Sequence, residues 1–120
     1  MPLNLLKKRR CRSMRFTVCG STWFLVFVRP MDNRLLRSDG SRTIGVSDNK
    51  VKTVFIADNL SEKLTDKVLC HELCHVFSFE NNLDIPIDIE EMIADFMSKY
   101  GRDIIYLADR IMTDMIRVVA

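Results

Sequence analysis

The sequence has no apolar run long enough to cross a membrane. The stretch from Val18 to Val28 is shorter than the roughly 18 apolar residues that a transmembrane helix needs, and Gly20, Ser21 and Thr22 interrupt it. The N-terminus also lacks the order of a secretory signal, because its apolar residues precede the basic ones instead of following them. We therefore expect a cytoplasmic protein whose four cysteines are free thiols.

Acidic residues are absent from the first fifteen positions, which carry six of the eighteen lysines and arginines. Residues 1–15 are therefore expected to form a basic, flexible arm that could contact nucleic acid or an acidic partner. The arm has no aromatic side chain, so base stacking is not indicated. With 120 residues, 48% of them apolar, the chain has room for a single domain, which we assign to residues 16–120.

Histidine is scarce, and the only two histidines belong to one motif, His71-Glu72-Leu73-Cys74-His75. On a helix, residues four apart share a face, so both imidazoles can bind one ion, with Glu72 beside them as a base. The surrounding helix, Val68 to Phe79, is apolar nearly all round and should be buried. Burying a carboxylate and two imidazoles without partners costs several kcal/mol, so the pattern predicts a metal site.

A catalytic zinc site needs a third protein ligand and an open position for water. Glu91 and Asp95 lie four apart on a second predicted helix, so Glu91 could bind the ion while Asp95 orients a ligand histidine. Glu90 is the rival third ligand. Alternatively, Asp88 and Glu91 form a capping arrangement at the start of this helix.

Cys70 and Cys74 adjoin the histidines, and thiolates also bind zinc. On a helical wheel, however, the two cysteines lie about 100° away from the histidine pair. They are expected to pack as small buried apolar groups.

The expected elements are strands near 16–19 and 22–28, a polar linker over 29–42, and a hairpin whose turn spans 48–50. Helices are expected from Ser61 to about residue 82, from Asp88 to Tyr100 with a stop at Gly101, and from Arg102 onward. The last helix carries an apolar stripe and is expected to close the core. Strands followed by helices predict an α+β domain with a small, mainly antiparallel sheet on the central motif helix.

His71-Glu72-x-x-His75 followed by Glu91-x-x-x-Asp95 resembles the signature of the gluzincin metallopeptidases, above all the small ImmA/IrrE-like proteins. The resemblance covers roughly residues 43 to 97. It implies a minimal zincin-like fold with one zinc ion per chain, bound by His71, His75 and Glu91, while Glu72 activates water and Asp95 supports a histidine. It also implies that an edge strand, placed at residues 51–57, borders the substrate groove.

The leading interpretation is a cytoplasmic zinc metalloprotease that cuts a specific protein target, as the resemblance to regulators of mobile-element repressors implies. Glu72 would be the general base, and Tyr100 or Tyr106 could donate a hydrogen bond to the oxyanion. A non-catalytic metal-binding regulatory module is the alternative, because no third histidine follows the motif. Nucleic-acid binding through the basic arm is the second alternative.

Overall fold

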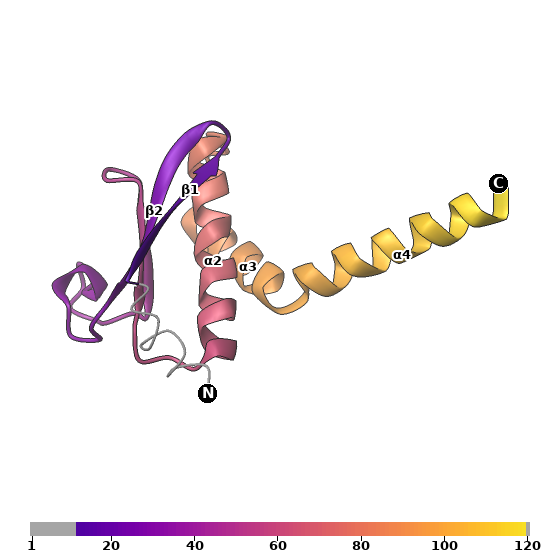
Figure 1. The fold of residues 1–120 in the computed structure, drawn as a ribbon. Helices are drawn as coiled ribbons and strands as arrows, with labels where there is room; N and C mark the ends of the chain where they lie inside the picture. Colours follow the sequence, from indigo (N-terminus) through magenta and orange to yellow (C-terminus); the bar gives the residue numbers. More distant parts are fainter. Residues whose placement is uncertain (1–11, 120) are drawn as a thin grey trace.

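The computed structural model describes residues 12–119. Its elements, in chain order, are β1 (Ser13–Val18), β2 (Ser21–Val28), a 3-10 turn η1 (Asn33–Leu35), β3 (Gly45–Asp48), β4 (Thr53–Ala57), α2 (Glu62–Glu80), α3 (Ile87–Phe96), a π-helical turn η2 (Met97–Gly101) and α4 (Arg102–Val119). Figure 1 shows the sheet on one side of α2 and α4 projecting away on the other.

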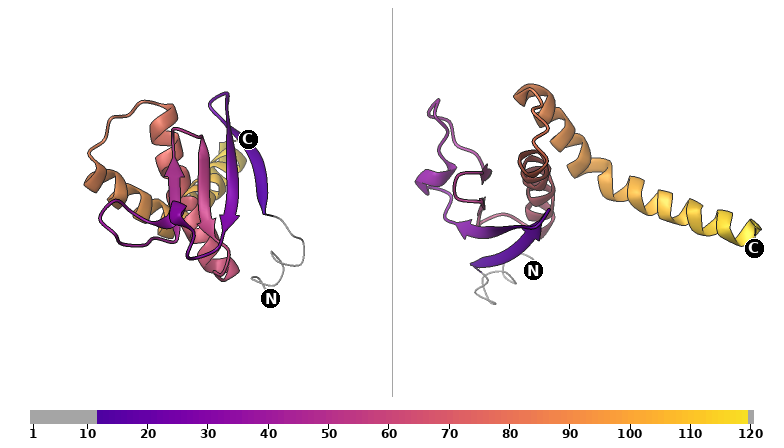
Figure 2. Two further views of the ribbon diagram at one scale, coloured as in Figure 1. Left: turned by 90° about the vertical axis from the view of Figure 1, so that its left-hand side faces the viewer. Right: turned by 90° about the horizontal axis from the view of Figure 1, so that it is seen from above.

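The four strands form one mixed sheet in the order β1-β2-β4-β3. The pairs β1/β2 and β3/β4 are antiparallel, and β2 and β4 are parallel. The strands lie side by side in front of the helices in the left view of Figure 2. The predicted α+β class, with a mainly antiparallel sheet on the motif helix, is confirmed.

The core lies between the sheet and α2. Along β2, Trp23, Leu25 and Phe27 are buried, whereas Phe24 between them is exposed, as expected for a strand with one face against a helix. Every residue of β4 is buried, because α2 covers one face of this central strand and the η1 segment contacts the other. These apolar contacts fix α2, and with it the two histidines, against the sheet.

The motif helix begins and ends where the sequence predicts. Ser61 is the N-cap, and its hydroxyl accepts a hydrogen bond from the backbone N–H of Leu64 at 3.1 Å. At the other end Asn81 is the C-cap. The helix runs alongside β3 at close range, and a Cβ atom at Gly45 would lie only 2.6 Å from Cγ1 of Val68. Glycine at position 45 therefore brings β3 against the helix that carries the motif.

Glu80 joins the end of α2 to the sheet. Its carboxylate accepts hydrogen bonds from the Ser21 hydroxyl at 2.6 Å, the Trp23 indole at 2.9 Å and the Lys52 ammonium at 2.9 Å. These bonds lower the pKa of Glu80 from its usual 4.5 to about 2, and the bond from Lys52 has the largest effect. The carboxyl group therefore stabilises the fold in its ionised form.

We expect that in Glu80→Gln the free energy of unfolding depends less on pH in the acidic range than in the wild-type protein. Because the folded-state pKa is depressed, the stabilisation by Glu80 is complete above pH 4.5 and is lost as the pH falls toward 2. Urea titrations at pH 7, 4 and 2.5 would measure this. The wild-type protein should lose more free energy of unfolding over this range than Glu80→Gln, and equal losses would contradict the proposed anchor.

Two details of the second helix differ from the prediction. Pro86 occupies the N-cap position and Asp88 lies in the first turn, so the predicted Asp88–Glu91 capping arrangement is wrong. Proline has a backbone conformation that suits the entry to a helix, and here it starts the helix early. The predicted stop at Gly101 is also wrong, because the helical backbone continues through η2 into α4. Gly101 is buried, and a Cβ atom there would lie 2.7 Å from Cε of Met97.

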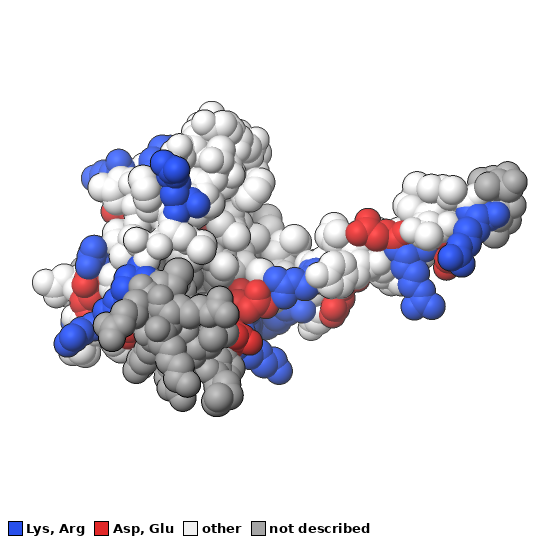
Figure 3. All heavy atoms as spheres, in the orientation of Figure 1, with Lys and Arg blue, Asp and Glu red and all other residues white. Residues whose placement is uncertain are grey.

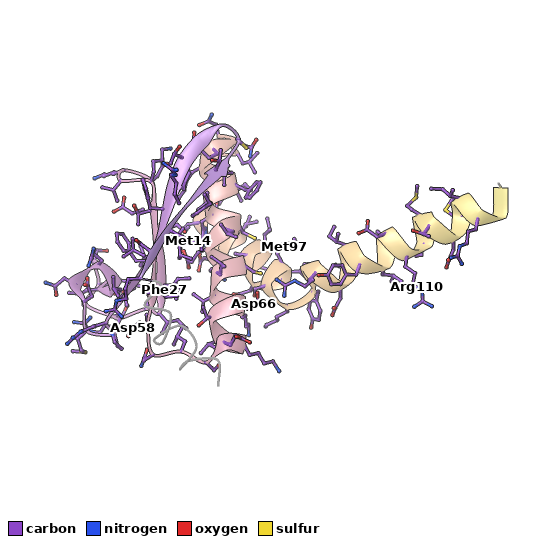
Figure 4. All side chains as sticks on the ribbon, in the orientation of Figure 1. Met14, Phe27, Asp58, Asp66, Met97 and Arg110 are labelled. Atoms are coloured by element: carbon purple, nitrogen blue, oxygen red, sulfur yellow. The ribbon has the colours of Figure 1, made fainter. Side chains whose placement is uncertain are left out.

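The prediction that the last helix closes the core is wrong as well. Residues 102–117 of α4 are all exposed, and the helix extends away from the sheet in Figure 1 and in the right view of Figure 2. Arg102 ties its first turn to Asp66 of α2 through bonds of 2.7 and 3.0 Å. Figure 4 shows Asp66 near this junction and Arg110 about midway along the projecting helix. The continuous helical backbone from α3 directs α4 outward, so the large apolar side chains of its stripe are exposed.

Side chains of both charge signs lie along α4 in Figure 3. Among the described residues, no helix has the length and apolar content of a membrane span.

The predicted basic arm falls mainly on residues 1–11, which lie outside the described residues, while Ser13, Met14 and Arg15 belong to β1.

Candidate metal centre

The polar face of α2 lines a cavity of about 1010 Å³ between β3, α2 and α3. His71, Glu72 and His75 contribute from α2, and Glu91 and Asp95 contribute from α3. The two helices pack against each other, with Ala94 of α3 fully buried. A small residue there lets α3 approach α2 closely enough for its carboxylates to reach the histidines.

His71, His75 and Glu91 present one ligand atom each within 4.8 Å of one another. The two imidazole Nε2 atoms are 3.3 Å apart. The Glu91 carboxylate lies 2.5 Å from Nε2 of His75 and 3.5 Å from Nε2 of His71. The structure therefore brings together the three residues that the sequence singles out as ligands.

The opposite nitrogen of each imidazole contacts a different carboxylate. Nδ1 of His71 lies 2.9 Å from Oδ1 of Asp95, as expected for an orienting residue. Nδ1 of His75 is hydrogen-bonded to Oε2 of Glu90. Each carboxylate accepts the Nδ1–H proton and so fixes a tautomer with a lone pair on Nε2.

This arrangement suits a cation. Two Nε2 lone pairs and an anionic carboxylate converge on one point, and three acceptors without a shared proton or cation repel one another. Two imidazoles and one carboxylate, with the fourth position open toward a cavity, match the ligand set of catalytic zinc sites. The donor set of this chain therefore fits such an ion.

Glu72 is buried beside the histidines, with 7% of its surface exposed. The Ser47 hydroxyl of β3 lies 2.8 Å from Oε1 of Glu72 and 3.0 Å from its backbone carbonyl oxygen. Burial raises the pKa of the Glu72 carboxyl above its usual range, and the hydrogen bond from Ser47 opposes this shift. A buried carboxyl with a raised pKa, beside two imidazoles at the wall of a cavity, is suited to take up and release a proton.

The sequence analysis did not predict the buried hydrogen bonds that link His75, Glu90 and Ser78. Glu90 accepts hydrogen bonds from His75 Nδ1 and from the Ser78 hydroxyl. Burial opposes ionisation of Glu90, but the bonds from Ser78 and His75 outweigh it and lower the carboxyl pKa. Ser78 is the one further polar residue in the apolar stretch of the motif helix, and this signal could have identified the partner of Glu90.

The contacts of Glu90 bear on the question of the third ligand. One carboxylate oxygen of Glu90 contacts Nδ1 of His75 and the other contacts the Ser78 hydroxyl, so Glu90 lies on the side of His75 that faces away from the convergence point. The Glu91 carboxylate, in contrast, contacts the Nε2 atoms of both histidines. The geometry thus gives the two neighbouring glutamates different positions, Glu91 at the candidate ion and Glu90 behind a ligand.

We expect Glu90→Gln to weaken zinc binding about 10–100-fold, although it touches none of the three candidate ligand atoms. The amide is a poorer acceptor than the carboxylate, so the His75 imidazole is held less firmly and is less basic. Competition with a chromophoric zinc chelator would measure the affinity. Asp88→Asn, which removes an exposed charge from the same helix, is the matched control and should leave it unchanged. Wild-type zinc affinity in Glu90→Gln would contradict the orienting role.

Two further pairs of residues that the sequence analysis considered lie outside the convergence point. Cys70 and Cys74 are half-buried outside the convergence point, and burial raises the pKa of the Cys74 thiol. Cys70 lies against Arg102 at the α4 junction. Tyr100 and Tyr106, considered as oxyanion donors, are 53% and 63% exposed and do not line the cavity.

The predicted groove strand is wrong. Residues 51–57 do not line the cavity, because β4 lies between β2 and β3 and is covered on both faces. The bordering segment is the preceding one, where Thr43 to Ser47 line the cavity and β3 is the last strand of the sheet. The first strand of the hairpin, not the second, is the edge strand.

A family model described as the IrrE N-terminal-like domain, a peptidase family, matches residues 25–115. The match includes β3, α2 and α3, and with them the polar residues of the site: His71, Glu72, His75, Ser78, Glu90, Glu91 and Asp95. Searches of the curated proteins and of the solved structures found no match.

Proposed function

The chain belongs to the peptidase family of the IrrE N-terminal-like domain, and from this membership we propose that it is a zinc-dependent metallopeptidase that hydrolyses a specific protein target. The observation that carries the proposal is the convergence of His71 Nε2, His75 Nε2 and the Glu91 carboxylate at the wall of a cavity. One ion per chain, in a site with a free fourth position, is the state expected to be active.

In the proposed reaction, the protein holds the ion through His71, His75 and Glu91, while Asp95 and Glu90 hold the two imidazoles. A zinc ion bound there would polarise the scissile carbonyl and make its water a stronger acid. Glu72 takes a proton from the attacking water and passes it to the nitrogen of the leaving amine. Ser47 keeps the Glu72 carboxyl in place through the 2.8 Å hydrogen bond.

The free edge of β3 supports an extended peptide as the substrate. The Ala57 N–H donates to the Ile44 carbonyl, so hydrogen bonds to β4 alternate from Ile44 along β3. This alternation directs the backbone groups of Gly45 and Ser47 toward the open edge, on the side of the cavity, where the Thr43 hydroxyl contacts both backbone groups of Gly45. A substrate segment can add there as a further strand and bring its peptide bond in front of Glu72.

Removal of the metal tests the proposal. The purified chain with one equivalent of zinc is incubated with a peptide library from a digested proteome, and new termini are identified by mass spectrometry. We expect cleavage that stops after treatment with a zinc chelator and returns when zinc is added back. Cleavage that persists without metal, or a zinc-loaded chain that produces no new termini, would contradict the proposed function.

A further inference from the structure

The cavity has two chemically different ends, and the direction of β3 relates them to the direction of a bound peptide. β3 and α2 run in the same direction. The beginning of β3 lies beside the middle of α2, where Gly45 approaches Val68 and Glu72. Further along β3, Ser47 contacts Glu72, and in the following turn Lys52 contacts Glu80 at the end of α2. A chain that pairs antiparallel with β3 therefore has its amino end near Asn49 and its carboxyl end near Thr43. Antiparallel pairing is the slightly more stable of the two.

The end near Asn49 is apolar. The cavity wall there includes four large apolar side chains from the end of α2, the following loop and the start of α3, namely Phe79, Leu83, Ile85 and Ile87, together with Asn49 and Asn82. Three of them are well exposed, Phe79 at 36%, Leu83 at 53% and Ile87 at 68%. Asp84 also lines this end and adds a negative charge, which disfavours an acidic ligand residue.

The end near Thr43 carries two basic side chains beside the exposed apolar side chains of Ile44 and Leu64. Arg37 and Lys67 line it, and both side chains are exposed. Among the described residues, neither forms a salt bridge. Of the nearby carboxylates, Asp95 contacts His71, whereas Asp39 accepts hydrogen bonds from Ser41 and interacts electrostatically with Arg37 without forming a salt bridge. Two positive charges are thus available to a ligand at this end.

The spacing places both ends close to the reacting bond. Lys67 precedes His71 by four residues and Phe79 follows His75 by four, so each lies about 6 Å from the motif along the helix axis. An extended peptide covers this distance in about two residues. Each end can therefore contact side chains about two residues from the scissile bond.

We infer that this cleft selects an extended peptide with large apolar residues on the amino side of the scissile bond and acidic residues on the carboxyl side. The inference rests on the proposed peptidase function and adds the class of target sequence. Arg37 and Lys67 are the residues that recognise the acidic part, and Phe79 and Leu83 contact the apolar part.

Binding to an inactive variant tests the inference without requiring turnover. Zinc-loaded Glu72→Gln is titrated into fluorescein-labelled peptides, and anisotropy reports affinity. One peptide has two leucines, then Ala-Ser, then two glutamates; a second has the reverse order; a third has glutamine in place of glutamate. We expect the first to bind about tenfold more tightly than the second and several-fold more tightly than the third, with the difference shrinking in high salt.

Charge reversal identifies the residues responsible. Arg37→Glu with Lys67→Glu should remove the preference for glutamate and favour a peptide with lysine at those positions. Lys63→Glu, an exposed change one turn earlier on α2 that lies outside the cavity, is the matched control and should preserve it. The inference would be overturned if no peptide binds, if all peptides bind equally, or if the reversed peptide binds more tightly. It would also be overturned if the preference for glutamate persists in the variant with both Arg37→Glu and Lys67→Glu.

The same peptides given to the wild-type chain separate the two proposals. Cleavage of the first and the reversed peptide at equal rates would overturn the inference and leave the peptidase function standing. Selective binding to Glu72→Gln, with no cleavage by the zinc-loaded wild type, would support the polarity of the cleft and contradict the proposed function.

Discussion

Replacing Glu72 with glutamine is expected to abolish peptide hydrolysis while leaving zinc content unchanged. Glutamine has nearly the same shape and can still accept the hydrogen bond from Ser47, but it cannot take a proton from water. General-base catalysis contributes about 10²–10⁴-fold to such reactions, so the rate constant should fall by at least that factor. Cleavage rates for a peptide found in the library screen, together with elemental analysis of the same samples, would measure both quantities.

Glu62→Gln is the control for this change, because Glu62 is an exposed carboxylate at the start of the same helix. It should leave both the rate and the zinc content at wild-type levels. A Glu72→Gln protein that still cleaves at the wild-type rate would show that another group takes the proton. Loss of zinc in Glu72→Gln would instead show that the residue supports the ion, and the assignment as base would lose its basis.

Replacing Glu91 with alanine is expected to weaken zinc binding by more than the roughly 10–100-fold that loss of an outer partner causes. The Glu91 carboxylate contacts both Nε2 atoms, so its removal leaves two neutral imidazoles to hold a divalent cation. The side chain is partly exposed, and its loss should cost little folding stability. Chelator competition and thermal unfolding of the metal-free protein would test both expectations.

His75→Ala provides the comparison for Glu91→Ala, since it removes an undisputed member of the motif. Both variants should lose zinc, whereas Glu90→Gln should bind it more weakly than the wild type yet more tightly than Glu91→Ala. If Glu91→Ala keeps wild-type affinity while Glu90→Ala loses the ion, the third ligand is Glu90 and the proposed division between the two glutamates is wrong.

The sequence predicts the centre of this fold well because its signals are local. An N-cap serine, an apolar stretch and a polar terminus define α2, and a short apolar run that follows Gly20 and ends before Pro30 defines β2. The four-residue spacing of His71 and His75, and that of Glu91 and Asp95, follows from helix geometry alone. These local rules bring the predicted ligands to two facing helices.

The features that sequence reasoning missed depend on contacts between distant segments. Ser78 is a local sign that a polar partner exists, but that this partner is Glu90, turned toward His75 and Ser78 instead of the candidate ion, depends on how α3 packs on α2. The order of strands in the sheet, which makes β3 and not β4 the edge, depends on the parallel pairing of β2 with β4. The apolar stripe of α4 resembles that of a core helix, but the uninterrupted helical connection through η2 carries it away from the core.

Zinc content per chain, measured by elemental mass spectrometry on the purified wild-type protein, tests the central claim most directly. The proposed site predicts one tightly bound zinc per chain, present on purification or taken up when zinc is supplied. A wild-type protein that holds no metal after zinc is supplied in excess would contradict the account, and the histidine–carboxylate cluster would then be a structural feature of the core.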